Sequence, residues 1–288
     1  MDGLKETLLE LIISSLDGFD KMVATAQSVL TGGSFNVNTV WASVLGLSNA
    51  LKPFCYIVIC ICLLLEFAQV AQKVDIIKFE HGVKIGVKMV LAKVCIDIAP
   101  TFLRACYNQS VIWINAVVGM GGYTSLGSML SSEIETQLNS VTGLWSVLGL
   151  FVSTMVVALA IKVCGLLITV IAYGRFFELM VYLAVSPLPC AFFPMGDGTG
   201  GGFSRITQKF FKSFIAVCLQ GVMILICIRI FYAIIGTSFQ SLINEAVAAG
   251  TASGIVSELS YTMLLFAIVL VMAVAKCGSW ARSIIDAM

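Results

Sequence analysis

Six charged side chains interrupt the apolar stretches of this sequence, and they are the residues best placed to do chemistry. If those stretches cross a membrane, each central charge costs about 2.5–3.5 kcal/mol, so it should face protein groups or water. Three interpretations stay open: structural ion pairs or snorkelling side chains, the lining of a polar passage, and a proton relay. The relay is the weakest, because basic residues outnumber acidic ones and no chain of histidines exists. The six residues are Glu66, Lys93, Asp97, Arg104, Lys162 and Arg229.

The spacing of these charges predicts some of their partners. Asp97 follows Lys93 by four residues, so the two can pair along one helix, and Arg104 falls at nearly the same angle on a helical wheel. Lys162 lies near the middle of another apolar stretch, where it can meet Asp97 or Glu66. The sequence therefore predicts a group of charges directed inward, with more than one pairing open.

No pattern in the sequence predicts catalysis or a cofactor site. The glycine-rich run at 196–202 resembles a phosphate-binding loop, but Phe203 follows it and the lysine of that motif is missing. We interpret the run as a flexible turn, with a docking loop for a cytoplasmic partner as the weaker alternative. Neither HExxH nor GxSxG occurs, and the ten cysteines contain no CxxC pair. We expect a non-enzymatic protein without metal or cofactor, for which a bound phospholipid is the one ligand left open.

The elements that carry these charges are predicted to be membrane helices. The chain is 59% hydrophobic and 11% charged, whereas about a quarter of the residues of a soluble domain are charged. Roughly 20 apolar residues in a helix cross a bilayer. We therefore predict an all-α, polytopic helical membrane protein with about five transmembrane helices. Their ranges are 53–71, 89–118, 144–172, 214–236 and 259–276.

Between the third and fourth of these ranges, residues 175–194 form an apolar segment that should not make a regular helix. Pro187, Pro189 and Pro194 each remove a backbone donor. Unpaired backbone is tolerated at membrane depth only inside protein or beside water, so we predict a broken or re-entrant element.

A basic amphipathic helix should follow the glycine-rich turn. Arg205, Lys209 and Lys212 fall within about 60° of one another on a helical wheel. The simplest interpretation is a cytoplasmic interfacial helix that contacts anionic lipid headgroups. Contact with nucleic acid is the weaker alternative, because stacking aromatic residues are missing from that face.

The N-terminal segment and the distribution of charge complete the predicted organisation. Residues 1–50 read as an amphipathic helical segment that lies at an interface or packs on the bundle, and 51–288 as the transmembrane core. The connections 119–143 and 237–257 contain no Lys or Arg, whereas 73–93 carries five basic residues and 205–212 carries three. By the positive-inside rule the N-terminus is outside and the C-terminus is cytoplasmic.

Three short motifs resemble those of one family. The runs Arg175-Phe-Phe-Glu178 and Ser186-Pro-Leu-Pro189, then Phe210-Phe-Lys212 leading to Gln220-Gly221, are similar to TrbL-type polytopic inner-membrane subunits of type IV secretion (conjugation) systems, in the Gram-positive branch. The resemblance covers about 144–282, and before that only the layout agrees. It implies that Pro187 and Pro189 shape the broken segment and that Arg175 and Glu178 fix its start. It also implies that Gln220 and Gly221 give a polar contact and close packing.

The resemblance further implies a function. Such proteins are non-enzymatic channel components of a bacterial cytoplasmic membrane that form homo-oligomers and contact lipids. They work with other secretion subunits and cytoplasmic ATPases to carry a DNA–protein substrate, which this chain can contact transiently. Two other hypotheses stay open from the residues themselves. One is a small-solute transporter or channel that uses the intramembrane charges, and the other is a membrane scaffold without a passage.

Overall fold

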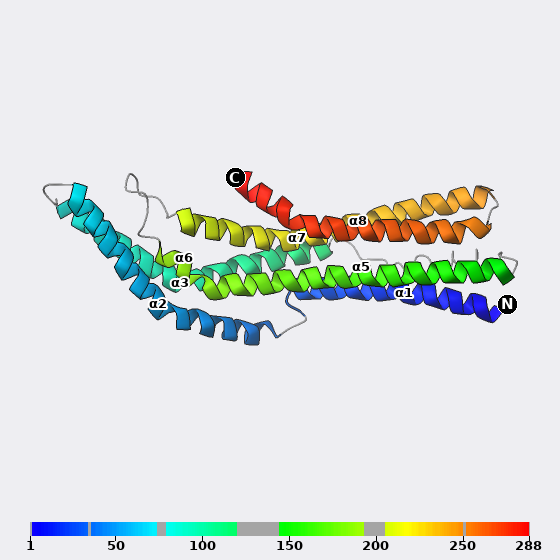
Figure 1. Ribbon diagram of the computed structural model, residues 1–288, viewed down its shortest axis with the longest axis horizontal. Helices are drawn as coiled ribbons and strands as arrows, with labels where there is room; N and C mark the ends of the chain where they lie inside the picture. The colour runs from blue at the N-terminus through cyan, green and yellow to red at the C-terminus, as the bar shows by residue number, and fades with distance from the viewer. Residues whose placement is uncertain are drawn as a thin grey trace. The chain divides into compact units, whose positions relative to one another are not determined.

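The described residues are helical, without any strand among them, which confirms the all-α prediction. In a computed structural model the described residues are 2–33, 36–73, 79–119, 144–192, 205–249 and 252–287 (Figure 1). The helices are α1 (Asp2–Leu30), α2 (Val37–Lys73), α3 (Phe79–Gly119), α5 (Leu144–Val185), α6 (Pro187–Ala191), α7 (Arg205–Ala249) and α8 (Ala252–Ala287).

Four stretches of the described helices are long and apolar enough to cross a membrane. They are Asn38–Ala68, Phe151–Ala191, Arg205–Ser238 and Tyr261–Ala287, and they contain most of the first, third, fourth and fifth predicted spans. The predicted span at 89–118 lies in α3, which is not among the four because its most apolar part contains three charged residues, Lys93, Asp97 and Arg104. A polytopic membrane protein is confirmed, and the fifth span stays a prediction.

The helices extend well beyond the predicted spans. Pro53, where the first predicted span starts, lies inside α2. A membrane helix tolerates such a proline because neighbouring groups satisfy the freed backbone. The predicted outside connection at 237–257 is wrong as a loop, since 237–249 continue α7 and 252–257 begin α8. At 1.5 Å per residue, α5 and α7 are each roughly 65 Å long, about twice the hydrocarbon thickness.

The proline break is also shorter than predicted. Residues 175–185 are not a separate element, because α5 runs through them to Val185. The helix is interrupted at Ser186, whose hydroxyl donates to the Leu183 carbonyl at 2.9 Å. Pro187 then starts α6, a position where proline needs no donor. Pro189 lies within α6, and Pro194 falls outside the described residues.

The chain divides into two packed units. Unit 1 comprises Met1–Ser34, Ile114–Gly174 and Gly221–Gly278, and unit 2 comprises Phe35–Trp113, Arg175–Gln220 and Ser279–Met288. The predicted boundary at residue 50 falls inside α2. The helices α3, α5, α7 and α8 contribute residues to both units.

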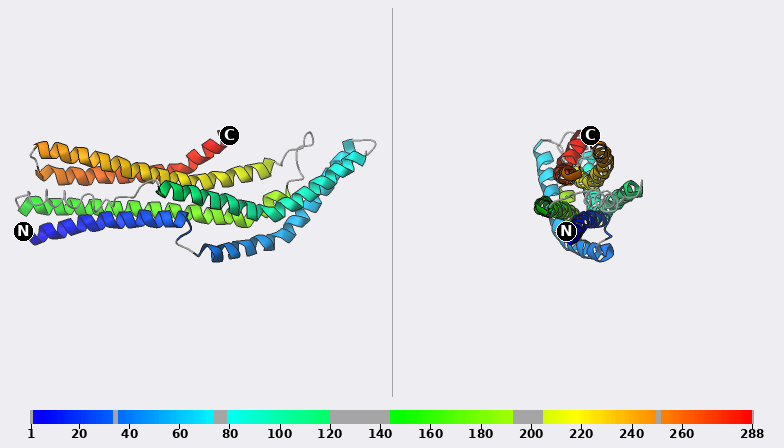
Figure 2. Two further views of the ribbon diagram at one scale, coloured as in Figure 1. Left: turned by 180° about the vertical axis from the view of Figure 1, so that it is seen from behind. Right: turned by 90° about the vertical axis from the view of Figure 1, so that its right-hand side faces the viewer.

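Unit 1 is a helical bundle in which α1 is a full member. The apolar face of α1 is buried among residues of α5, α7 and α8, and Figures 1 and 2 show α1 beside the first part of α5. This decides between the two predicted positions of the N-terminal helix in favour of packing on the bundle. The residues of α1 that belong to this core are Leu8, Ile12, Leu16, Phe19, Val23, Ala26 and Leu30.

Three contacts hold α1 in this bundle. The rings of Phe19 and Phe231 lie 5.9 Å apart. Thr169 on α5 donates a hydrogen bond to the Met22 carbonyl at 3.1 Å. Beside it, an added Cβ on Gly165 would lie 2.8 Å from the Met22 sulfur and 3.2 Å from the Phe19 ring. The two helices approach closely because position 165 has no side chain.

Unit 2 combines α2 and most of α3 with the end of α5, the start of α7 and the end of α8. The short helix α6 packs against α2, and the Thr207 hydroxyl on α7 donates to the Pro189 carbonyl at 2.8 Å. An aromatic cluster joins α5 to α7, in which the Tyr182 ring lies 5.5 Å from Phe210 and 6.2 Å from Phe214.

Candidate functional site

The strongest polar feature of unit 2 is a seam between α2 and α3, centred on Asp97. The Asp97 Oδ1 atom accepts a hydrogen bond from the Tyr56 hydroxyl at 3.0 Å. The Lys52 ammonium lies 3.6 Å from the same oxygen. Lys52 and Tyr56 are four residues apart on α2, so one helix face presents both to the carboxylate.

Two further contacts tie the same helices together on either side of Asp97. Glu66 and Lys88 form an ion pair, and the Arg104 guanidinium lies 4.7 Å from the centre of the Trp41 ring, a cation–π contact. Along α2 the partners rise from 41 to 66 while along α3 they fall from 104 to 88. The two helices are therefore antiparallel, and polar contacts connect them along their length.

These contacts revise the predicted pairings. Asp97 is held from α2 and not by Lys93 of its own helix. Lys93 is exposed and has no ion-pair partner within the described part of the chain. Within unit 2, Asp97 pairs with Lys52 and Tyr56, and Glu66 pairs with Lys88. Lys162 is exposed on unit 1, beside Gly18. The partners come from distant parts of the sequence, which helical spacing alone does not connect.

The charge on α7 has a structural role in unit 1. The Arg229 guanidinium donates to the carbonyl of Val118, one residue before the end of α3. The last carbonyls of a helix have no partner within it and carry partial negative charge, so a cation is favourable there. Nearby, the Tyr232 hydroxyl donates to Asp20 Oδ1 of α1 at 2.6 Å. The amphipathic pattern of the N-terminal segment did not predict this contact.

A polar stripe runs along α3 beside the seam. At 100° per residue, its members lie within about 60° of one another. All are exposed except Arg104, which is half-buried, and Asp97 keeps a side-chain exposure of 44% in spite of its two partners. From first to last the stripe covers roughly 33 Å, the thickness of a membrane. Its members are Lys93, Asp97, Arg104, Asn108 and Asn115.

Sequence reasoning found the first three members of this stripe and missed the two asparagines. The same wheel angle would have identified them. The buried Ser48, on the α2 face that also carries Lys52, leaves its hydroxyl without a hydrogen-bond partner among the described residues. The side chains of the seam therefore do not satisfy all of its buried hydrogen-bonding groups.

A second group of polar residues lies where α5, α7 and α8 meet in unit 2. Arg175 pairs with Glu178 one turn later at 2.5 Å, and Arg282 of α8 reaches the same carboxylate at 3.9 Å. Arg175 and Glu178 therefore do not start a broken segment; they lie inside α5 and connect it to α8. The predicted basic face is exposed at the start of α7: Arg205, Lys209 and Lys212.

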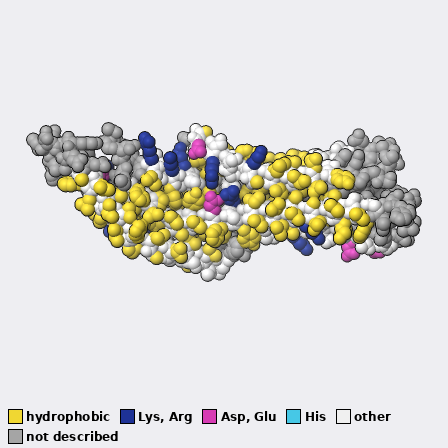
Figure 3. Space-filling view, in the orientation of Figure 1, with side chains coloured by type: hydrophobic (Ala, Val, Ile, Leu, Met, Phe, Trp, Pro, Cys, Tyr) yellow, Lys and Arg dark blue, Asp and Glu magenta, His cyan; other side chains and the backbone are white. Residues whose placement is uncertain are grey.

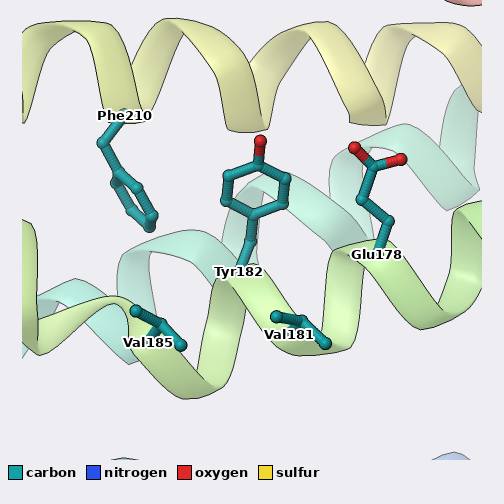
Figure 4. Close-up of a pocket in the computed structure, with 5 residues that line it drawn as sticks. All are labelled: Glu178, Val181, Tyr182, Val185 and Phe210. Carbon is teal, nitrogen blue, oxygen red and sulfur yellow. The ribbon is translucent and has the colours of Figure 1, made fainter.

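A pocket of about 550 Å³ lies beside this ion-pair group. It is lined by Glu178, Val181, Tyr182 and Val185 of α5 and by Phe210 of α7. Figure 4 shows Glu178 and Tyr182 directed toward α7, with Phe210 reaching down from that helix. The Tyr182 hydroxyl lies 2.8 Å from the Ser213 hydroxyl, which holds the two helices together at one side of the pocket.

The two residues predicted to pack the fourth span do so only in part. Gln220 is buried, but its Nε2 atom has no hydrogen-bond partner in the described residues, so the predicted polar contact is not seen. An added Cβ on Gly221 would meet Ile114 at 3.7 Å and Leu30 at 3.8 Å, which is ordinary contact. Position 221 therefore does not require glycine as position 165 does.

Metal ligation is not indicated by the described side chains. Within the described ranges no three His, Cys, Asp or Glu residues come together as a possible ion site. The ten cysteines are all free thiols, of which Cys227 and Cys277 approach to 3.5 Å between α7 and α8.

With its long apolar helices, the chain is a polytopic helical membrane protein. A sequence profile of the family described as "TrbL/VirB6 plasmid conjugal transfer like protein" matches residues 20–187, more than half of the chain. The chain belongs to this family, and it is a conjugal transfer membrane subunit of type IV secretion. Searches of curated proteins and of solved structures found no match.

The extent of the match corrects the range given by the sequence motifs. The similarity begins at residue 20, in α1, and not near 144 as the motifs indicated. It includes the Arg175–Glu178 run and Pro187 but ends before the 210–212 and 220–221 motifs. The whole seam between α2 and α3 lies inside the matched range.

Proposed function

We propose that the chain is a channel or scaffold subunit of a conjugative type IV secretion system that helps to carry a DNA–protein substrate across the cytoplasmic membrane. It acts without catalysis of its own, in a homo-oligomer, and separate cytoplasmic ATPases supply the energy. In this proposal it lies in the bacterial membrane with its N-terminus outside and its C-terminus in the cytoplasm. Family membership supports the assignment to a conjugative secretion system. The proposed role within that system rests on helix α3.

The observation that carries the proposal is the exposed polar stripe of α3. A charged group at membrane depth is unfavourable against lipid and is normally turned toward protein or water. Lys93, Asn108 and part of Asp97 are not covered by α2, although α2 is the partner helix of the seam. Another copy of the chain, or a water-filled passage between copies, would provide the missing polar surroundings.

The contacts from α2 explain how a helix with several charged residues can be held in the membrane. Lys52 neutralises the carboxylate of Asp97 and Tyr56 donates a hydrogen bond to it, and Trp41 covers the guanidinium of Arg104. Because residues of α2 pair with or cover these charged groups, the remaining polar groups of α3 form a surface that tolerates water. Such a surface suits the wall of a passage for a hydrated substrate better than contact with lipid.

Conjugation frequency tests the proposal directly. A strain that lacks the gene is complemented with the wild-type chain or with the double variant Lys93→Leu, Asn108→Leu. Because both side chains are exposed, leucine should not disturb the fold, but it removes the polar surface. We expect transfer to fall by about 30-fold, the effect of losing two polar contacts of about 1 kcal/mol each, while the amount of protein in the membrane is unchanged.

The matched control changes two exposed apolar residues of the same helix, Ile98→Leu and Ile112→Leu. This control should transfer DNA at the wild-type frequency. Normal transfer by the Lys93, Asn108 double variant would show that the stripe does not line a passage and would leave a scaffold without a passage. Undiminished transfer in the strain without the gene would remove the conjugation role altogether and reopen the solute-transporter hypothesis.

A further inference from the structure

The pocket between α5 and α7 has the shape and setting of a lipid site. Its wall consists of Val181, Tyr182, Val185 and Phe210, all apolar over most of their surface, with the carboxylate of Glu178 at one end. Its volume of about 550 Å³ falls within the usual range for small-molecule sites. Val181 is 48% exposed and Phe177, one turn before it, is 71% exposed, so the pocket is continuous with the apolar surface of α5.

The charge around the pocket is complementary to an anion. Arg175 and Arg282 carry two positive charges beside the single negative charge of Glu178. Arg175 already neutralises this carboxylate at 2.5 Å. The contact to Arg282 is looser, at 3.9 Å, and the Arg282 side chain is 61% exposed. Its guanidinium therefore keeps donors in the fork arrangement that binds phosphate oxygens.

The position along the helices is that of a membrane surface. The pocket lies at the beginning of the apolar stretch Arg205–Ser238 and near the end of the stretch Tyr261–Ala287. Figure 3 shows Lys and Arg side chains gathered over the start of α7 and the end of α8, above a surface that is otherwise mostly apolar. Cations at this level contact anionic headgroups, while the apolar groups beyond them contact acyl chains.

We propose that this pocket binds one anionic phospholipid, with an acyl chain against Val181, Tyr182, Val185 and Phe210 and the headgroup phosphate on Arg282. Glu178, held by Arg175, keeps the Arg282 side chain at the rim. The lipid would thereby connect α5, α7 and α8 of unit 2. This inference needs only that the chain lies in a bilayer, and it does not depend on the proposed role in DNA transfer.

Photo-crosslinking of the purified full-length chain tests the proposal. The protein is placed in phosphatidylcholine nanodiscs that contain a phosphatidylglycerol analogue with a diazirine on the acyl chain, and labelled peptides are identified by mass spectrometry. Labelling of the segment 181–185 is measured relative to that of residue 170, an exposed apolar site of the same helix. We expect the pocket to be enriched with the anionic probe and not with a phosphatidylcholine probe of the same acyl chain.

Two kinds of variant separate the headgroup contact from the apolar wall. Arg282→Gln should lower the enrichment about fivefold, the effect of one cation near a headgroup, and Arg282→Lys should lower it less. Val185→Trp fills the pocket and should abolish the enrichment, whereas Val170→Trp should leave it unchanged. Millimolar inorganic phosphate should not compete.

Three results would overturn the inference. Equal labelling by both probes would show only general lipid contact. Full enrichment in Arg282→Gln would show that the phosphate is held elsewhere. Competition by inorganic phosphate would show a site for free anions and not for a lipid.

Discussion

Single side chains in this protein connect helices mainly by placing a charge against a group on another helix. Asp20 accepts from Tyr232, Asp97 from Tyr56, and Glu178 lies between Arg175 and Arg282. Where water is excluded, such bonds are stronger, and an unpaired partner is correspondingly costly. The contacts therefore specify which helices meet. Apolar helix faces specify this poorly in a membrane, because lipid is as apolar as leucine and competes equally for them.

The bond between Tyr232 and Asp20 offers the cleanest test at this scale. Tyr232→Phe removes one hydroxyl and leaves the ring, which contacts Phe231 at 5.5 Å. A hydrogen bond to a charged group contributes about 1.5–3 kcal/mol, so we expect the free energy of unfolding to fall by that amount. Thermal unfolding of the detergent-solubilised protein measures it.

The matched control is Tyr261→Phe, which removes the hydroxyl of a tyrosine that is 57% exposed on α8. This variant should unfold at the wild-type temperature. If both variants shift the transition equally, or if neither does, the contact between α1 and α7 does not contribute to stability as proposed.

At the scale of elements, the contact between α1 and α5 depends on one glycine. Gly165→Leu forces a side chain into the space occupied by Met22 and Phe19. Overpacking of a filled contact typically costs about 1–3 kcal/mol, and separation of α1 would also expose the Thr169 bond to Met22. We expect a lower unfolding temperature and faster proteolysis of residues 2–30 in the detergent-solubilised protein.

Gly174→Leu provides the control, because an added Cβ on Gly174 meets nothing within 4 Å. Leucine is a better helix former than glycine, so this variant should be as stable as the wild type or slightly more so. Destabilisation of both variants alike would mean that α5 needs glycine for its own backbone and not for its approach to α1.

The elements themselves were only partly predictable from the sequence. Hydropathy located the apolar parts of α2, α5, α7 and α8, because about 20 apolar residues are needed to cross the hydrocarbon. It did not locate their ends, since polar residues can continue a helix as readily as apolar ones. Hydropathy also did not identify Gly165 as a packing residue, because the composition of an apolar segment does not show which residues face another helix.

For the candidate site, the sequence predicted the charges but not their partners. Helical spacing placed Lys93, Asp97 and Arg104 on one face of α3, and the structure keeps them there. The partners Lys52 and Trp41 lie on a different helix, and contacts between distant segments are not encoded in any local period. The same is true of Arg282, which meets Glu178 from another helix of unit 2.

For the molecule as a whole, α3 decides the arrangement in the membrane. Within the described ranges, four helices qualify as spans by length and composition, and an even number of crossings would leave both termini on one side. If α3 crosses as well, the termini lie on opposite sides. The antiparallel seam favours a crossing, because each charged group of α3 that contacts α2 is neutralised or covered there.

Labelling of single cysteines distinguishes the two arrangements. In a variant whose native cysteines are replaced, Thr7→Cys and Ser283→Cys give exposed thiols near either end. We expect a membrane-impermeant maleimide to reach position 7 on intact protoplasts and position 283 only after lysis.

Reaction of both from one side would mean that α3 does not cross, and the polar stripe would then lie at the membrane surface. In that case Lys93 and Asn108 would face bulk water, and their replacement by leucine should leave DNA transfer unchanged. The hypothesis of a passage along α3 therefore requires both results: opposite sides for positions 7 and 283, and reduced transfer by the double variant.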